Sequence, residues 1–262
     1  MSETVETMKR EYEARRAAFE IFDTNAWWDP RKTDCFRPVS DFAQWNTELR
    51  RFGIGSALVT HIDSAMYDAA YGNERLAELL GGSDTLHGCM VLVPEMPAEY
   101  IGGMLNRGFA AARMFPKTYK HSMRGYAAGR LLAALEERRV PLLLWHSEVD
   151  WDAMDEICRS YPRLPVVVEG HNIKLLYHAR NYIALLREHQ NFHLETHNVV
   201  LFDELSNLAR EFGAARLLYG SYFPYNTPHH SLMNVTAAQL DDKDTAAILG
   251  GNFKRLMAGI VR

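Results

Sequence analysis

The sequence predicts a single (β/α)8 barrel, an α/β fold, with a helical leader before it and extra helices after it. Short apolar runs that end in polar residues alternate with segments whose apolar residues recur at helical spacing, and no linker interrupts them. The chain also has 262 residues, close to the roughly 250 that such a barrel needs. We therefore expect a leader over residues 1–18 and one barrel domain over residues 19–262.

The eight expected strands are apolar runs bounded by prolines, glycines or polar residues. This pattern is typical of strands that are buried on both faces of a parallel sheet. In chain order the runs are 18–27, 56–63, 86–94, 109–116, 141–148, 164–172, 191–199 and 215–224.

The expected helices carry apolar residues every three or four positions. Ser40 is the expected N-cap of the first helix after the leader, and the pair Gly81-Gly82 ends the next one. The charged leader has the same spacing, and we expect it to lie on the barrel or on a partner subunit. The expected helices are 2–18, 41–52, 73–80, 97–106, 124–139, 150–161, 175–189, 201–212, 231–240 and 243–257.

Composition narrows the classes of partner and the compartment. Lys and Arg total 29 against 33 Asp and Glu, a formal net charge of −4 without a basic stripe, so we expect no nucleic-acid partner. No run approaches the roughly 18 apolar residues of a membrane span, so we expect no membrane partner. Cys35, Cys89 and Cys158 have no CxxC spacing, which favours a reducing compartment. Because residues 1–16 also lack the apolar core of a secretory signal, we expect a cytoplasmic protein.

Two histidines follow the fifth and sixth apolar runs. His146 ends Pro141–His146, and His171 ends Val166–His171. Because parallel strands point the same way, both should emerge at the edge of the barrel where such proteins bind ligands. Neutral imidazoles in this setting could bind a metal or act in catalysis, or they could form hydrogen bonds to a loop.

The next strand adds a second pair of polar residues. Glu195 and His197 are two positions apart, so their side chains should lie on the same side of the strand. His197 could serve as a third ligand or as a general base.

Three charged residues near these strand ends have open roles. Glu169 and Glu148 could orient the histidines or act as general acids or bases. Arg113, in an otherwise apolar strand, could hold a substrate carboxylate or pair with an internal glutamate.

Aromatic residues near the strand ends could wall an apolar pocket, although some must be ordinary packing. No nucleophile elbow, Walker loop or GxGxxG motif follows a strand, so phosphate cofactors are not expected. The aromatic candidates are Trp27, Trp28, Tyr119, Trp145, Tyr222, Phe223 and Tyr225.

Five segments, in this order and at these intervals, make the chain resemble the amidohydrolase superfamily. Within it, the chain is similar to the amidohydrolase-related (amidohydrolase 2) group of metal-dependent hydrolases and decarboxylases. The resemblance extends from Phe19 to Ala258 and implies the barrel fold. The segments are Ala111–Pro116 (AARMFP), Pro141–His146 (PLLLWH), Val166–His171 (VVVEGH), Leu217–Pro224 (LLYGSYFP) and Ala247–Leu256 (AILGGNFKRL).

The resemblance also implies where a metal site would lie. The family uses an HxH pair on the first strand, one His on each of the fifth and sixth strands, and an Asp after Gly-Ser on the eighth. The fifth- and sixth-strand positions are His146 and His171, whereas HxH falls on Asn25 and Trp27 and the Asp on Tyr222. An indole cannot ligate a metal, and neutral Tyr and Asn are weak ligands. The usual motif is therefore degenerate, since a zinc site needs about three protein ligands.

We accordingly expect no metal cofactor in the usual form. A divalent metal, Zn or Mn, would need a rebuilt site around His146 and His171 that recruits His197, Glu169 or Glu195. Conventional single-metal hydrolysis through such a site stays open as a third hypothesis.

The first hypothesis is an enzyme, a hydrolase or a decarboxylase (lyase), that acts on a small carboxylated or aromatic molecule. The second is a catalytically silent barrel that serves as a small-molecule-binding or scaffold protein. We leave a homo-oligomer open. The expected catalytic residues are His146, His171, His197, Glu169 and Arg113, with Arg113 as anion clamp. The expected substrate-binding residues are Asn25, Trp27, Glu148, Glu195 and Tyr222.

Overall fold

The protein forms the predicted barrel of eight parallel strands, which are hydrogen-bonded in the order β1 to β8. The computed structural model describes residues 3–31, 37–171, 175–201 and 203–262. Backbone hydrogen bonds close the barrel between β1 and the segment after β8: Thr24 donates to Tyr219, and Tyr222 donates to Asn25. The strands are β1 (Ile21–Trp28), β2 (Ile54–His61), β3 (Leu86–Val91), β4 (Phe109–Arg113), β5 (Leu142–Trp145), β6 (Val166–Glu169), β7 (Phe192–Glu195) and β8 (Leu217–Leu218).

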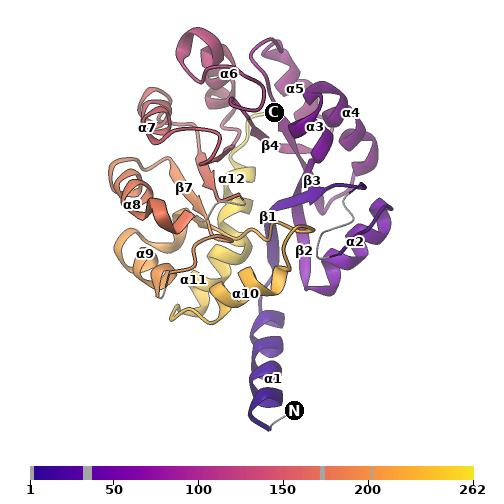
Figure 1. Cartoon of the computed structure of the whole chain (residues 1–262), viewed down its shortest axis with the longest axis vertical. Coiled ribbons are helices and arrows are strands. Elements are labelled where there is room, and N and C mark those ends of the chain that lie inside the picture. Colours follow the sequence, from indigo (N-terminus) through magenta and orange to yellow (C-terminus); the bar gives the residue numbers. More distant parts are fainter. Residues whose placement is uncertain (1–2, 32–36, 172–174, 202) are drawn as a thin grey trace.

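Helices form a ring around the strands, and α1 projects beyond this ring (Figure 1). The α-helices are α1 (Glu3–Ala17), α2 (Phe42–Arg51), α3 (Ile62–Met66), α4 (Ala69–Leu80), α5 (Glu99–Leu105), α6 (Gly125–Arg138), α7 (Trp151–Ser160), α8 (Ala179–Glu188), α9 (Glu204–Phe212), α10 (Pro228–Thr236), α11 (Asp242–Ala246) and α12 (Asn252–Ala258). Two 3-10 turns, η1 (Leu175–His178) and η2 (Ala214–Arg216), and a π-helical turn, η3 (Ala247–Gly251), complete the set.

The leader is a helix, as predicted, and it contacts the C-terminal helices. The hydroxyl of Tyr12 lies 2.9 Å from Nδ1 of His229 on α10, and Arg15 forms an ion pair with Asp242 on α11 at 2.5 Å. α1 is therefore attached to the body at its C-terminal half.

Most strands are shorter than predicted. The expected strand 215–224 is paired only over the two residues of β8, and the expected strand 109–116 ends at Arg113. Polar and proline residues follow these points, and they lie in loops at the C-terminal edge. The sequence pattern marks apolar runs, whereas a strand lasts only as long as its neighbour offers backbone partners.

Several helices also differ from the prediction. Asp41, not Ser40, caps α2, because its carboxylate accepts a hydrogen bond from the amide of Gln44 at 2.8 Å. The expected strand 56–63 gives way after His61 to the unpredicted α3. Asp68 caps α4, which begins at Ala69 rather than at residue 73. The predicted helix 243–257 contains the π turn η3 between α11 and α12.

The barrel interior is apolar at its base and polar toward the C-terminal ends of the strands. Phe253 of α12 closes the base, where it packs on Phe22 of β1. The other residues of this base cluster, which come from six further strands, are Leu58, Cys89, Ala110, Ala111, Leu143, Val167 and Leu218. Because side chains alternate along a strand, the residues two positions further on form the next inward layer, which includes Thr60, Arg113 and Glu169.

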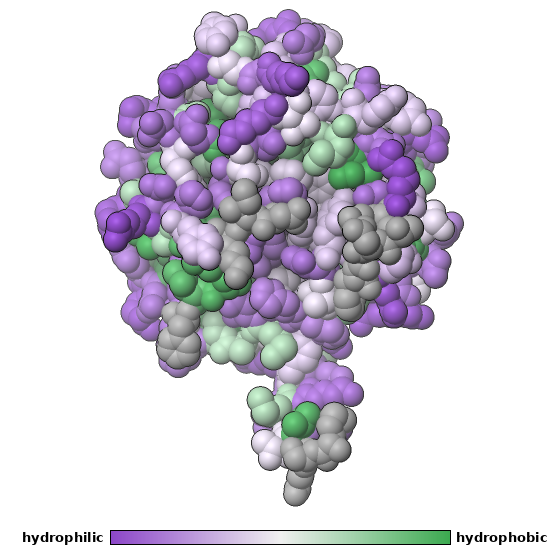
Figure 2. All heavy atoms as spheres, viewed as in Figure 1, coloured by the Kyte–Doolittle hydropathy of each residue, from purple (hydrophilic) through white to green (hydrophobic). Residues whose placement is uncertain are grey.

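The surface in Figure 2 is largely polar, with scattered apolar side chains. Among the described residues, no helix is long and apolar enough to cross a membrane. Cys89 and Cys158 are buried free thiols, and Cys35 lies outside the described residues.

Candidate active site

Arg113, the last residue of β4, lies fully buried in the centre of the barrel. Its Nε and Nη2 donate to the two carboxylate oxygens of Glu169 on β6, at 3.0 and 2.5 Å. Nη1 donates to the hydroxyl of Thr60, and Nη2 also donates to Oδ1 of Asn25 at 3.1 Å. Burial opposes the charged form, but the Glu169 carboxylate outweighs it and raises the pKa of Arg113. Two roles were considered for Arg113, and the structure shows one of them, the pairing with an internal glutamate.

Asn25 of β1 connects this ion pair to β7. Its Oδ1 also accepts from the indole nitrogen of Trp27 at 2.8 Å. Its Nδ2 donates to Oε2 of Glu195 at 3.1 Å and lies 3.5 Å from Nδ1 of His197. Both ends of the amide are thus occupied by protein groups, and one hydrogen-bonded network spans the barrel from Glu169 to His197.

Glu195 and His197 form a buried dyad at the end of β7. Oε1 of Glu195 accepts from the backbone amide of His197 at 2.6 Å, and Oε2 contacts Nδ1 of the imidazole. An ionised carboxylate can only accept, so the contact places a proton on Nδ1. Burial lowers the pKa of His197, but the charges of Glu195, Glu169 and Asp23 outweigh it, and the net shift is upward. Nε2 of His197 is buried and has no hydrogen-bond partner among the described residues.

Gly220, just after β8, gives Glu195 the space for this contact. A Cβ at position 220 would lie 2.4 Å from Oε1 of Glu195 and 2.8 Å from Cβ of Asn25. Only glycine therefore fits here without moving the dyad.

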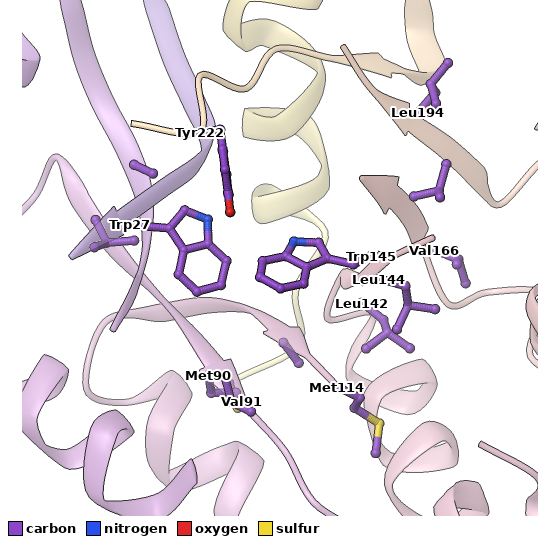
Figure 3. Packing of buried hydrophobic residues seen from close by; sticks show 14 of the residues in the cluster. Trp27, Met90, Val91, Met114, Leu142, Leu144, Trp145, Val166, Leu194 and Tyr222 are labelled. Carbon is purple, nitrogen blue, oxygen red and sulfur yellow. The ribbon is translucent and has the colours of Figure 1, made fainter. Parts of the chain in front are cut away.

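The aromatic rings of Trp27, Trp145 and Tyr222 lie close together inside the barrel (Figure 3). The Trp27 ring lies over the Arg113 guanidinium, 4.8 Å from its central carbon, and 5.1 Å from the Trp145 ring. The hydroxyl of Tyr222 points toward these two indoles. Tyr222 has a φ of +58°, which is unusual for a bulky residue. Its ring stacks on His197 at 5.3 Å.

His171 follows β6 and is half-buried. Its ring stacks on Trp145 at 3.8 Å and meets Tyr222 edge-on at 5.6 Å. Burial, and secondarily the charge of His197, lower the pKa of His171 to about 4. The imidazole is therefore neutral near pH 7.

His146 and Glu148 contact backbone groups, and Nδ1 of His146 lies 3.3 Å from the backbone carbonyl oxygen of Glu169. Trp145 continues the inward row of Leu143, so His146 faces the other way, with its ring 5.1 Å from that of His178. Burial lowers the pKa of His146, and its Nε2 has no partner among the described residues. Glu148 accepts hydrogen bonds from the amides of Lys117 and Thr118, at 2.8 and 3.0 Å, and so holds the loop after β4.

The sequence interpretation missed two residues of the network, Thr60 and Asp23. Thr60 lies two positions after Leu58 on β2, so both side chains are on the same face of the strand. This period-2 spacing could have identified Thr60. Asp23 is buried and accepts from the amides of Asn25 and Ser221, at 3.0 and 2.9 Å, and from the Ser221 hydroxyl. Burial raises the pKa of Asp23 to about 6, although these hydrogen bonds oppose the shift. A carboxylate inside an apolar strand was its visible signal.

The side chains at the positions expected for a metal site contact other protein groups. Both the oxygen and the nitrogen of the Asn25 side-chain amide form hydrogen bonds with protein groups. The Trp27 indole has an N–H donor but no atom that could ligate a metal. The His146 and His171 rings pack on different neighbours, His178 and Trp145. Within the described ranges, no three His, Cys, Asp or Glu side chains are grouped as metal ligands.

The fold and the polar strand ends define a (β/α)8-barrel protein whose candidate site lies at the carboxyl ends of the strands. A family model described as amidohydrolase matches residues 60–257, so the chain belongs to the amidohydrolase family. No curated protein matches the chain.

Solved structures share the fold at low sequence identity. An uncharacterized TIM-barrel protein from Bordetella bronchiseptica matches 92% of this chain and 99% of its own, with a TM-score of 0.72 and 14% identity. A Pseudomonas putida protein, provisionally named a 2-pyrone-4,6-dicarboxylic acid hydrolase, matches 93% and 99%, with a TM-score of 0.68 and 14% identity. A dihydroxybenzoic acid decarboxylase from Polaromonas sp. JS666, with bound manganese and the inhibitor 2-nitroresorcinol, matches 92% and 97%, with a TM-score of 0.66 and 14% identity.

Proposed function

We propose that the barrel mouth is an acid–base active site that hydrolyses or decarboxylates a small carboxylated or aromatic molecule without the family's metal. One observation carries the proposal: His197 is held through Nδ1 by Glu195, while its buried Nε2 has no partner among the described residues. A nitrogen held in this way is suited to proton transfer. The names of the Pseudomonas and Polaromonas relatives support the substrate class.

Each reaction uses His197 in a definite way. In decarboxylation, Nε2 gives its proton to the carbon that loses carbon dioxide, and solvent restores the proton. In hydrolysis, neutral Nε2 takes a proton from the attacking water and returns it to the leaving group. Glu195 orients the imidazole, and Asn25 fixes Glu195 in turn. Trp27, Tyr222 and neutral His171 supply the surfaces against which a flat substrate lies.

The buried pair of Arg113 and Glu169 supports this proposal over a rebuilt metal site. Arg113 is a fixed cation inside the barrel, and Glu169 and Asn25 are committed to it. A divalent ion recruiting Glu169 would have to break this pairing, which leaves a buried guanidinium without its counter-charge.

A second candidate, a silent barrel that binds a small molecule or serves as a scaffold, is favoured by a different observation. Trp27, Trp145 and Tyr222 are each less than 5% exposed and pack on one another at the mouth. Because these three side chains occupy the mouth, they would have to move before a substrate could enter.

Turnover of a panel of aromatic carboxylic acids and carboxylated lactones distinguishes the two candidates. We expect His197→Gln to lower turnover by about 10²–10⁴-fold, while thermal unfolding stays close to that of the parent protein. His230→Gln, on the exposed surface of α10, is the matched control and should leave turnover unchanged. Equal turnover in the His197 variant would overturn the proposed active site. Binding of panel members without any turnover would favour the second candidate.

A further inference from the structure

Trp145, the last residue of β5, contains a buried hydrogen-bond donor that no group in the described part of the chain accepts from. The side chain is 3% exposed, and its indole nitrogen has no hydrogen-bond partner among the described residues. Buried indole N–H groups usually find a partner, because leaving one unpaired carries a free-energy cost. The residues around this N–H indicate which acceptor it could bind.

Those surroundings combine flat ring surfaces with polar groups. Trp145 stacks on His171 at 3.8 Å and meets Phe115 edge-on at 4.8 Å. Its nitrogen lies on the side of the ring nearer to Tyr222, whose hydroxyl is directed toward the indoles (Figure 3). The Trp145 and Tyr222 ring centroids are 6.5 Å apart. Two neutral donors thus border the same part of the mouth.

Trp45 provides an internal comparison. Its indole nitrogen is also buried and unpartnered among the described residues. However, it packs outside the barrel among apolar rings: Phe42 at 5.4 Å, Phe223 at 5.9 Å and Trp28 at 6.3 Å. Trp45 is an unpaired donor within ordinary aromatic packing, whereas Trp145 lies beside polar groups at the candidate site.

We infer that the indole N–H of Trp145 binds a carboxylate oxygen of the substrate and selects carboxylated over neutral rings. A carboxylate is a strong acceptor that can take hydrogen bonds from Trp145 and Tyr222 together. The ring that carries it then lies against the surface of Trp27, whose centroid is 5.1 Å from that of Trp145. The inference rests on the proposed function for the place of the site, but it requires no turnover.

Indole N–H resonances of the full-length protein, labelled with nitrogen-15 at tryptophan, test the inference. Trp145→Phe and Trp45→Phe each remove one resonance and so assign it. Titration with benzoate should move the Trp145 resonance downfield and leave the Trp45 resonance in place. Benzyl alcohol, which has the ring without the charge, should move the Trp145 resonance much less. Trp145→Phe should weaken benzoate binding by about tenfold, and Trp45→Phe should leave it unchanged.

An unmoved Trp145 resonance, equal shifts with benzoate and benzyl alcohol, or equal benzoate affinity of Trp145→Phe would each overturn the inference. The same titration with His197→Gln separates it from the proposed function. A Trp145 shift that persists in this variant shows that binding at Trp145 does not depend on His197. If the variant also turns over substrate as fast as the parent protein, the catalytic proposal fails while the binding role of Trp145 stands.

Discussion

The guanidinium of Arg113 and the carboxylate of Glu169 make two hydrogen bonds, at 3.0 and 2.5 Å, where neither side chain is exposed to solvent. The pair joins β4 to β6 across the barrel, and Asn25 extends it to Glu195 and His197. Organisation of the candidate site and stability of the barrel therefore depend on the same side chains.

Removal of one charge of this pair should destabilise the protein strongly. Glu169→Gln leaves Arg113 buried without its counter-charge, which should lower the free energy of unfolding by about 3 kcal/mol. The exposed pair between Arg187 and Glu211 is the control, and Glu211→Gln should cost less than about 1 kcal/mol. Urea denaturation measures both. Similar decreases in the free energy of unfolding for the two variants would show that the buried pair stabilises the protein no more than the exposed pair does.

The Glu195 carboxylate should hold the pKa of His197 above its usual value. Glu195→Gln removes the nearest negative charge while burial remains, so the pKa of His197 should fall below that of the parent protein. An NMR titration of the histidine ring protons follows this change. Glu148→Gln serves as the control, because Glu148 is bound to the loop after β4. An unchanged pKa in the Glu195 variant would exclude the dyad as described.

Gly220 should be required for the position of Glu195. Gly220→Ala places a methyl group 2.4 Å from the present site of Oε1, so Glu195 must move. We expect loss of turnover and a shifted His197 resonance. Gly103→Ala, in α5, is the matched control: a Cβ there meets no atom within 4 Å, and helical alanine is favourable. If Gly220→Ala behaves like the Gly103 variant, the close approach has no functional role.

His193 should make the protein less stable in acid. Burial is the main cause that lowers its pKa, from 6.5 to about 4, so the unfolded chain binds the proton more readily than the folded one. Its contribution to stability is present above pH 6.5 and is lost as the pH falls through 4, by roughly 3 kcal/mol. His193→Gln should therefore lose less stability than the parent protein between pH 7 and pH 4. Parallel pH profiles in chemical denaturation would refute this.

The fold could be predicted from the sequence because each strand and helix has a recognisable hydrophobic pattern in its own segment. Eight apolar runs alternating with amphipathic segments leave few arrangements other than a closed parallel barrel. Strand ends were less visible, since β8 keeps only two paired residues of the ten expected. Pairing depends on neighbouring strands, which a local pattern does not contain.

The candidate site could be predicted only in part. Arg113, Glu169, Glu195 and His197 were placed at the correct edge, but their network could not be predicted because it joins residues of five strands that are far apart in the sequence. His146 is the clearest example of why the direction of a side chain could not be predicted. A strand buried on both faces gives no sign of which alternate residues face the barrel interior, and the structure turns Trp145 inward instead.

Metal content tests the central claim, a site that works without the family's metal, most directly. The protein is treated with a chelator, incubated with Zn, Mn or Fe salts, passed through a desalting column and analysed by mass spectrometry. We predict far less than one ion per chain, and turnover that does not depend on the added salt. One ion per chain that disappears in a His146→Ala, His171→Ala double variant would contradict the claim.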